Sequence, residues 1–476
     1  MFPAVPERAI AELGRTDPSP GTLALLVRDQ DTRRLLMLRA LLDAAAAADP
    51  AVCSRAQKSR LAEDWALLTE ADRRRPSDAG GAAGRAQPLS PARVRLLYPL
   101  TGPWLGHCLR RLTAEHRRSP QLARDLAHFS ALVAAAAARA DLPFSVRLTA
   151  RDGVLTLPSL GALRTAARGD VDVDVTYRSQ TLRLRQSETP DVTVYLESDV
   201  GAWSGSPAWQ TAYALPGLVP DAPPMPLDDL DPYRAARDPR HRALSGPVTL
   251  DDAERKRWLQ VWTGTATALR QAGAHRVATA KALLRCLVPL AQPPGAGSRG
   301  SCSATRREAF GALLSSTPPD PVTFGATLVH ELHHAQLAAL GEMVTLHQAT
   351  SEERYFAPWR PDARPYDGLL QGAYSHLAIA DYYQRRALAE ETADRQSAWA
   401  QYARYRAQVR AALPALVGSP DLTAPGRRFV DEMVGAYERM DAHPAPRDHT
   451  ARAEAYVRAA RVLWSQRHAP TSPPNE

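Results

Sequence analysis

Hydrophobic and polar positions follow two different periods along this chain, and the change of period divides it. Up to about residue 76, leucines recur at the three- and four-residue spacing of helices that bury one face. Helical spacing resumes from about 91 to 140, after a Gly/Ala/Pro-rich stretch at 77–90 that is typical of a linker. The same spacing dominates again from about 250 onward. We therefore expect mostly helices outside one central segment.

The central segment, from 144 to 200, shows the two-residue alternation of half-buried β-strands. Its alternating runs are separated by turn signals such as Asp152-Gly153 and Thr189-Pro190. Short turns between consecutive strands favour antiparallel pairing. The predicted fold class is therefore mainly α with a small antiparallel β-sheet (α+β). The expected strands are 146–149, 154–157, 171–175, 182–184 and 192–196.

These patterns predict four consecutive regions. Residues 1–90 form an N-terminal helical region and linker, and 91–249 form helices plus the small antiparallel sheet. Residues 250–468 form a helical domain with a loop at 350–367. The last segment, 469–476, is rich in proline and polar residues, so we expect it to be a disordered tail.

Composition narrows the class of protein. The chain has 476 residues, 45% of them hydrophobic, which is enough for two or three domains with their own cores. Its four cysteines are scattered and form no C-x-x-C pair, so the sequence predicts neither a disulfide framework nor a thiolate metal site. No signal peptide and no apolar run of about 18 residues is visible. We therefore expect a cytoplasmic protein that does not enter a membrane.

The net charge of +8 is carried largely by arginine. An excess of positive charge can attract an acidic peptide or a nucleic acid. However, no block of five or six like charges occurs, and the sequence contains no nucleic-acid-binding motif. We therefore interpret the charge as spread over the surface and expect no nucleic-acid partner.

The most specific chemical signal is the run His330-Glu331-Leu332-His333-His334, which fits H-E-x-x-H. Residues four apart lie on one face of a helix, so His330 and His334 can direct two imidazoles at one metal ion. Glu331 lies beside them and can orient a ligand or take a proton from metal-bound water. The alternative is a solvated helix face in which one of the three histidines is incidental. We predict a helical metal-binding core that carries this motif.

Two ligands on one helix leave the remaining metal positions to other elements. The first candidate is His376, in a predicted helix at 368–378 that would return antiparallel to the first helix. A histidine surrounded by Leu, Ala and Ile can equally be a core residue. The reserve candidates are His347, Glu342, Glu352 and Asp381.

The loop at 355–365, between the two predicted helices, contains three prolines and presents Trp359, Arg360 and Arg364. Arginine is suited to binding a carboxylate through two parallel hydrogen bonds. The loop therefore predicts an anion clamp beside the metal. The alternative is a structural loop whose arginine stacks on Trp359 or pairs with Asp362.

In combination, these motifs resemble the H-E-x-x-H domain proteins associated with ribosomally made, modified peptides, which are described as 2-oxoglutarate-dependent peptide β-hydroxylases. The resemblance covers about residues 90 to 400, and the chain departs from it at His333, where the family often has an aromatic residue. The matching segments, in order, are 227–234, 303–311, 328–335, 355–365 and 368–376.

This resemblance implies Fe(II) as the metal, with 2-oxoglutarate and O2 as cosubstrates. It also implies hydroxylation of a side-chain β-carbon in a precursor peptide, which is the expected partner. His330, His334 and His376 would then bind the iron, although non-haem iron oxygenases usually combine two histidines with a carboxylate. Glu331 would tune a ligand or a water molecule. A homo-oligomer is compatible with the sequence.

The resemblance also suggests roles for residues around the metal. Arg360 or Arg364, together with Trp359, would bind the distal carboxylate of 2-oxoglutarate. Asp228, Asp231 and Tyr374 would contact the peptide. For the two aspartates the alternative is a helix cap, which aspartate commonly provides.

Two other functions suit the same residues. In a zinc metallopeptidase, Glu331 would be the general base that activates zinc-bound water. The longer metzincin pattern fails at Leu337 and Leu340, however, and no downstream glutamate stands in the usual ligand position. The second alternative is a catalytically inactive protein that binds a peptide for a partner enzyme.

Overall fold

The computed structural model describes residues 5–74, 89–114, 117, 119–187, 189–197, 200–235, 246–293, 295, 301–389 and 394–468. Most of the expected linker and the whole expected tail at 469–476 lie outside the described residues. The chain forms two compact units, and each is assembled from separate stretches of sequence. They differ in this respect from the four consecutive regions expected from the sequence. The first unit comprises Met1–Asp29, Gln260–Leu284 and Pro318–Glu476, and the second comprises Gln30–Leu259 and Arg285–Thr317.

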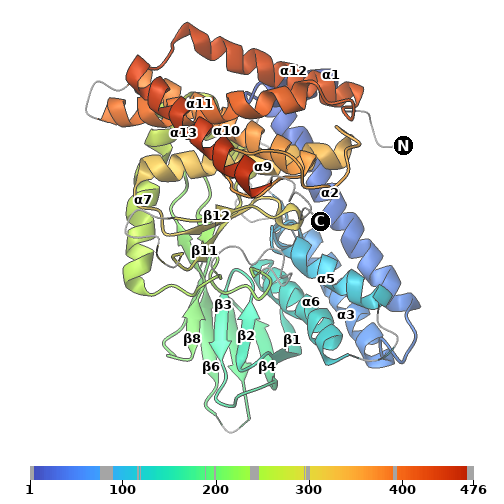
Figure 1. The fold of residues 1–476 in the computed structure, drawn as a ribbon. Helices are drawn as coiled ribbons and strands as arrows, with labels where there is room; N and C mark the ends of the chain where they lie inside the picture. Colours follow the sequence, from blue (N-terminus) through green and yellow to red (C-terminus); the bar gives the residue numbers. More distant parts are fainter. Residues whose placement is uncertain are drawn as a thin grey trace, which may run out of the picture. The chain divides into compact units, whose positions relative to one another are not determined.

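Helices predominate, as the sequence pattern predicts (Figure 1). Among the described residues, no helix combines the length and the apolar character needed to cross a membrane. The helices of the first unit are α1 (Glu7–Gly14), α8 (Ala274–Leu283), α9 (Pro321–Met343), α10 (Tyr366–Ala389), α11 (Asp394–Val417), α12 (Ala424–Arg439) and α13 (Arg447–Arg467). Those of the second unit are α3 (Arg55–Arg73), α4 (Pro91–Leu96), α5 (Thr101–Ala114) and α6 (Pro120–Arg139). Two helices contain residues of both units, α2 (Pro20–Ala47) and α7 (Asp252–Gln271).

The strands of the second unit form three sheets. The first sheet has the order β1-β4-β5-β6-β7, with β1 (Phe144–Ala150), β4 (Val171–Arg178), β5 (Thr181–Arg185), β6 (Val192–Leu196) and β7 (Ala202–Trp203). The second has the order β2-β3-β8, with β2 (Val154–Leu157), β3 (Gly161–Arg164) and β8 (Trp209–Thr211). The third has the order β12-β13-β11-β10-β9, with β9 (Tyr213–Leu215), β10 (Met225–Leu227), β11 (Cys286–Leu290), β12 (Ser303–Ala304) and β13 (Ala312–Ser316).

The antiparallel pairing expected between 144 and 200 is confirmed, and each expected strand is present. These strands are divided between two sheets, however, where the sequence suggested one. The third sheet was not predicted at all, and it is mixed, because β11 pairs in parallel with β10 and β13. Every residue of β11 and β13 is buried, so these strands have no solvent face and no polar alternation to reveal them.

Most residues of helix α6 are buried, and its C-terminal half consists almost entirely of alanine. Ala134, Ala135 and Ala138 pack against the strands of the first two sheets. Ala136 and Ala137 belong instead to the core formed with the other helices of the second unit. Because alanine side chains are small, α6 packs closely against the sheets on one side and against the other helices on another.

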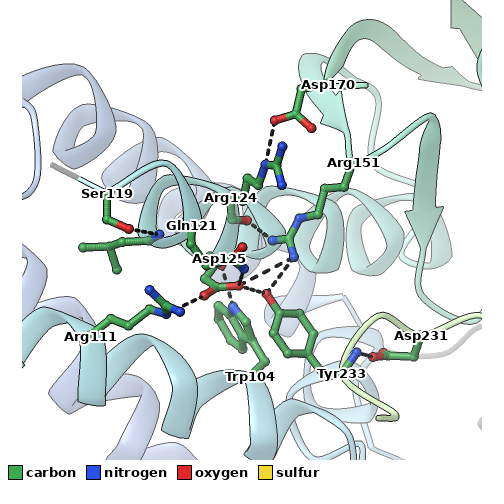
Figure 2. Close-up of polar contacts among 11 residues, drawn as sticks. Trp104, Arg111, Ser119, Gln121, Arg124, Asp125, Arg151, Asp170, Asp231 and Tyr233 are labelled. Atoms are coloured by element: carbon green, nitrogen blue, oxygen red, sulfur yellow. Dashed lines mark hydrogen bonds and ion pairs between the residues drawn. The ribbon is translucent and has the colours of Figure 1, made fainter. Parts of the chain in front are cut away.

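A buried polar network joins α6 to the segment that follows β10 (Figure 2). Asp125, which is fully buried, accepts a hydrogen bond from the Tyr233 hydroxyl at 2.7 Å and lies 3.6 Å from the Arg151 guanidinium. Arg111 lies 3.5 Å from the same carboxylate, and the Trp104 indole donates to the Asp125 carbonyl at 2.7 Å. Two cations therefore balance one buried carboxylate, which anchors Tyr233.

The aspartates at 228 and 231 hold this segment in a turn. Asp228 accepts hydrogen bonds from the backbone N–H of Leu230 and Asp231 and from the Tyr98 hydroxyl. Asp231 accepts the backbone N–H of Tyr233 at 2.7 Å. Their carboxylates therefore cap a turn, which is close to the capping alternative considered from the sequence.

Replacing Asp231 by asparagine is expected to stabilise the protein at high pH and to have little effect at low pH. Burial, and then the neighbouring Asp228, raises the pKa of Asp231 from 3.8 to about 7. The folded state therefore keeps a proton that the unfolded chain releases, so this group's contribution to stability falls as pH rises from about 4 to 7. Asparagine retains the acceptor for Tyr233 and removes the ionisation. We expect a gain of about 2–4 kcal/mol at pH 8 in urea unfolding.

The matched control is Asp431→Asn, an exposed position on α12, which should change stability equally little at both pH values. A constant difference between Asp231→Asn and the parent at pH 4 and pH 8 would contradict the assignment of a raised pKa.

Candidate metal centre

The H-E-x-x-H residues lie in the middle of α9, where the backbone is regular. The helix begins at an N-cap aspartate, because the Asp320 side chain accepts the backbone N–H of Thr323 at 2.8 Å. Pro321 occupies the first helical turn, where a missing N–H costs nothing. The helix expected from the sequence is therefore present, and it places residues 330 and 334 on one face.

His330 and His334 converge at the surface of α9. Their Nε2 atoms lie 3.1 Å apart, and their ring centroids lie 4.5 Å apart with the rings nearly perpendicular. Two nitrogen ligands that bind one ion at about 2.1 Å and at a right angle are about 3.0 Å apart. The spacing of the pair therefore fits two neighbouring positions around a single metal ion.

Gln371, on α10, orients His334. Its side-chain Oε1 lies 3.1 Å from Nδ1 of His334. An amide oxygen can only accept a hydrogen bond, so Nδ1 carries the proton and Nε2 presents its lone pair toward His330. Outer partners of this kind fix the tautomer of metal-binding histidines.

His376 approaches the pair from α10, which runs antiparallel to α9. Its ring, 7% exposed, has its centroid 5.6 Å from that of His330. Two imidazoles on one ion have centroids about 4.5–5.5 Å apart, so His376 lies just beyond this range. Nδ1 of His330 and of His376 is buried and has no hydrogen-bond partner among the described residues. In the part of the chain that the structure describes, no three His, Cys, Asp or Glu side chains are placed closely enough to hold an ion. A three-histidine site therefore requires His376 to move closer to the pair.

Burial favours the neutral form of His330 and His376, which is the form that binds metals. Burial, and then the neighbouring His334 and His376, lowers the pKa of His330 well below 6.5. Burial, and then His334 and Arg404, lowers the pKa of His376 to about 3. At neutral pH His330 and His376 are therefore uncharged, and each ring keeps one nitrogen lone pair.

His333 faces a different part of the protein from the pair. Its Nδ1 lies 2.6 Å from the carbonyl oxygen of Val329, and its Nε2 lies 3.2 Å from the guanidinium of Arg276. Arg276 in turn forms an ion pair with Asp381 at 2.7 Å. Of the three histidines in the run, His333 therefore belongs to a buried network behind the helix. Asp381, one of the reserve ligands, is committed to the same network.

The other reserve ligands lie in separate surroundings. His347 has its Nε2 3.6 Å from Asp367, and Glu352 is exposed and lies 3.5 Å from Arg354. Glu342 is exposed near the end of α9. Of the five candidates for the third ligand, His376 is therefore the one whose ring contacts the pair. Glu331 lies between the two histidines in sequence and is 3% exposed.

The loop at 355–365 lies on α10 because two glycines make room for it. Trp359 packs edge-on against His376, with 4.5 Å between ring centroids. A Cβ atom at Gly372 would lie 2.4 Å from Cζ2 of Trp359, and a Cβ atom at Gly368 would lie 2.9 Å from Nη2 of Arg364. These glycines are one helical turn apart, so the loop contacts the same face of α10 twice.

The two arginines of the loop differ in what they contact. Arg360 has a side chain that is 47% exposed and pairs with Asp362 at 3.2 Å, which is one of the alternatives considered from the sequence. Arg364 lies over Gly368 and has no hydrogen-bond or ion-pair partner for its guanidinium among the described residues. Arg364 is therefore the arginine better placed to receive an anion.

Three residues around the centre were not anticipated: Gln371, Tyr405 and Gln408. The ring centroid of Tyr405, on α11, lies 5.1 Å from that of His376, and Gln408, on the same helix, partly counters the lowering of the His376 pKa. No sequence signal identifies them, because their role depends on the offset between packed helices.

Replacing Gly372 by alanine is expected to displace Trp359 and to destabilise the protein by about 1–3 kcal/mol, since the added methyl group overlaps the indole. Thermal unfolding and tryptophan fluorescence would measure the two effects. The matched control is Gly341→Ala on α9, where a Cβ meets nothing within 4 Å and the substitution should stabilise by up to about 1 kcal/mol. Equal effects at the two glycines would contradict the packing described for Trp359.

The residues expected to contact a peptide lie in different units. Asp228 and Asp231 belong to the second unit, and Tyr374 belongs to the first. Tyr374 is fully buried, its hydroxyl donates to the carbonyl of Leu13 at 2.8 Å, and its ring contacts His333. The hydroxyl is thus already satisfied within the protein. Contact of these three residues with a peptide stays a prediction.

Comparison with protein-family models yields no match, and comparison with curated proteins yields none either.

Proposed function

We propose that this protein is an Fe(II)/2-oxoglutarate-dependent oxygenase that hydroxylates the β-carbon of a side chain in a ribosomally made precursor peptide. The observation that supports the proposal most directly is the His330–His334 pair, whose Nε2 atoms lie 3.1 Å apart on one face of α9. Together with 2-oxoglutarate and O2, bound iron would supply the oxidising power needed to break a C–H bond.

The protein's own residues hold and orient the ligands. His330 and His334 would provide two nitrogens to the iron, and His376 would provide a third if its ring moved closer to the pair. Gln371 keeps His334 in the tautomer whose Nε2 lone pair is free. Glu331, buried beside the pair, keeps a ligand or a water molecule in place.

The loop at 355–365 forms the cosubstrate side of the site. Arg364, whose guanidinium has no partner among the residues that the structure describes, binds the distal carboxylate of 2-oxoglutarate. Trp359 covers His376 and excludes water from that side of the centre. In this assignment Arg364, rather than Arg360, is the clamp.

The test is anaerobic loading of the purified protein with Fe(II), followed by air, 2-oxoglutarate and the precursor peptide. We expect succinate and a peptide heavier by one oxygen atom. Peptide cleavage with zinc, without any need for 2-oxoglutarate, would instead identify a zinc metallopeptidase in which Glu331 is the general base. Peptide binding without either reaction would identify a catalytically inactive peptide-binding protein.

A further inference from the structure

The second unit contains two hollows that share part of their lining. One, with a volume of about 330 Å³, lies against α6 and the strands β1 to β3. The other, of about 590 Å³, follows β8 and the segment that leads into α7. Arg164, Gln210 and Thr249 line both hollows. We call the joined feature the β8 groove.

The shape of the β8 groove suits an extended chain. Strand β8 is the last strand of its sheet, so the groove follows a sheet edge. One hollow has leucine walls from Leu148, Leu155 and Leu230, and the other has Trp209 and Leu250. A compact ligand would fill one hollow, whereas an extended peptide places side chains in both.

The acidic residues that line the β8 groove already have partners within the unit. Asp229 lies 3.4 Å from Arg255 and accepts the backbone N–H of Leu250 at 2.9 Å. Asp251 accepts the backbone N–H of Glu254 at 2.8 Å, and Asp152 lies 3.9 Å from a guanidinium nitrogen of Arg124. Asp229 is therefore balanced by a cation at close range, whereas the exposed Asp152 and Asp251 keep most of their negative charge.

The arginines of the groove are less fully neutralised. Arg164 is exposed at the junction of the two hollows, and its guanidinium has no hydrogen-bond or ion-pair partner among the described residues. Arg234 donates to the backbone carbonyl of Asp231 and has no ion-pair partner within the described ranges. The groove thus presents positive charge beside apolar walls, which complements a chain that carries carboxylates.

We propose that the β8 groove binds an extended, acidic segment of the peptide substrate. Carboxylate side chains pair with Arg164 and Arg234, and the apolar side chains between them occupy the leucine-lined and tryptophan-lined walls. The proposal rests on the proposed function only for the identity of the peptide as a substrate, because the groove's chemistry is independent of the metal centre.

The test is fluorescence anisotropy with metal-free protein and two fluorescein-labelled peptides of about ten residues. In one peptide Glu alternates with Leu, and in the other Lys alternates with Leu. We expect the acidic peptide to bind in a salt-dependent manner and the basic one not to bind. Arg164→Glu should weaken the acidic peptide's binding by about tenfold or more, because the variant replaces attraction by repulsion.

The matched control is Arg178→Glu, which makes the same charge change at an exposed position at the end of β4. It should alter binding by less than about twofold. Thr249→Trp, which fills the junction without changing charge, should also weaken binding. Equal losses in Arg164→Glu and Arg178→Glu, or binding unaffected by both Arg164→Glu and Thr249→Trp, would overturn the proposal.

Displacement of the labelled peptide by free glutamate at similar concentration would show a small-carboxylate site and would also overturn it. The assay contains neither iron nor 2-oxoglutarate, so it does not depend on whether the protein is a hydroxylase. Failure to bind would likewise leave the metal centre untouched.

Discussion

Replacing His330 or His334 by alanine is expected to abolish both metal retention and hydroxylated product. Each residue supplies one of two Nε2 atoms that lie 3.1 Å apart, so its loss leaves a single fixed nitrogen on α9. Loss of an outer partner alone lowers metal affinity by about 10- to 100-fold, and loss of a ligand should exceed that. Metal content after anaerobic loading and desalting measures the first effect, and mass spectrometry of the peptide measures the second.

The matched control is His443→Ala, which removes an exposed histidine from the same unit and should leave both measurements unchanged. Gln371→Leu should give an intermediate result, because it frees the His334 ring while keeping both nitrogens. Metal retained at full stoichiometry in both alanine variants would eliminate the assignment of the pair.

The sequence predicted this pair because it depends on local geometry alone. Any regular helix brings side chains four residues apart to one face, whatever packs around it. The sequence alone does not say which of the three histidines lies outside the metal site, since all three fall within one and a half helical turns. The structure shows that it is His333, because the Arg276 guanidinium from α8 contacts this ring on the other side of the helix.

The antiparallel strands between 144 and 200 were predictable for a similar reason. One face of each strand packs on the core and the other faces solvent, so apolar and polar residues alternate along the sequence. The sequence of the third sheet shows no such alternation, because β11 and β13 are buried on both faces. Their apolar residues cannot be distinguished from those of a short buried helix.

Contacts between helices account for the remaining features of the site. His376 was expected near the pair from the return of a second helix, and its ring does contact His330. The partnership of Gln371 with His334 depends on the axial offset between α9 and α10, which no periodicity specifies. The glycines at 368 and 372 did carry a signal, since two glycines one turn apart within a helix imply a close approach to that face.

Replacing Arg364 by alanine is expected to raise the KM for 2-oxoglutarate by about 30- to 150-fold, whereas Arg360→Ala should raise it less than about threefold. Removing one partner of a hydrogen-bonded charge pair costs about 2–3 kcal/mol or more, and the first range is that cost expressed as affinity. Arg360 is half-exposed and already pairs with Asp362, so its loss removes a surface contact.

Succinate formation measured against 2-oxoglutarate concentration distinguishes the two variants, with metal content measured in parallel to show that the iron ligands are intact. Arg364→Lys should recover part of the affinity, because lysine restores the charge and not the two parallel hydrogen bonds. The larger effect at Arg360 would assign the carboxylate to that side chain and would mean that the Arg360–Asp362 pair opens when 2-oxoglutarate binds. Equal and small effects at both positions would place the anion outside the loop at 355–365, and the proposed cosubstrate site would then be wrong even if the histidine pair binds iron.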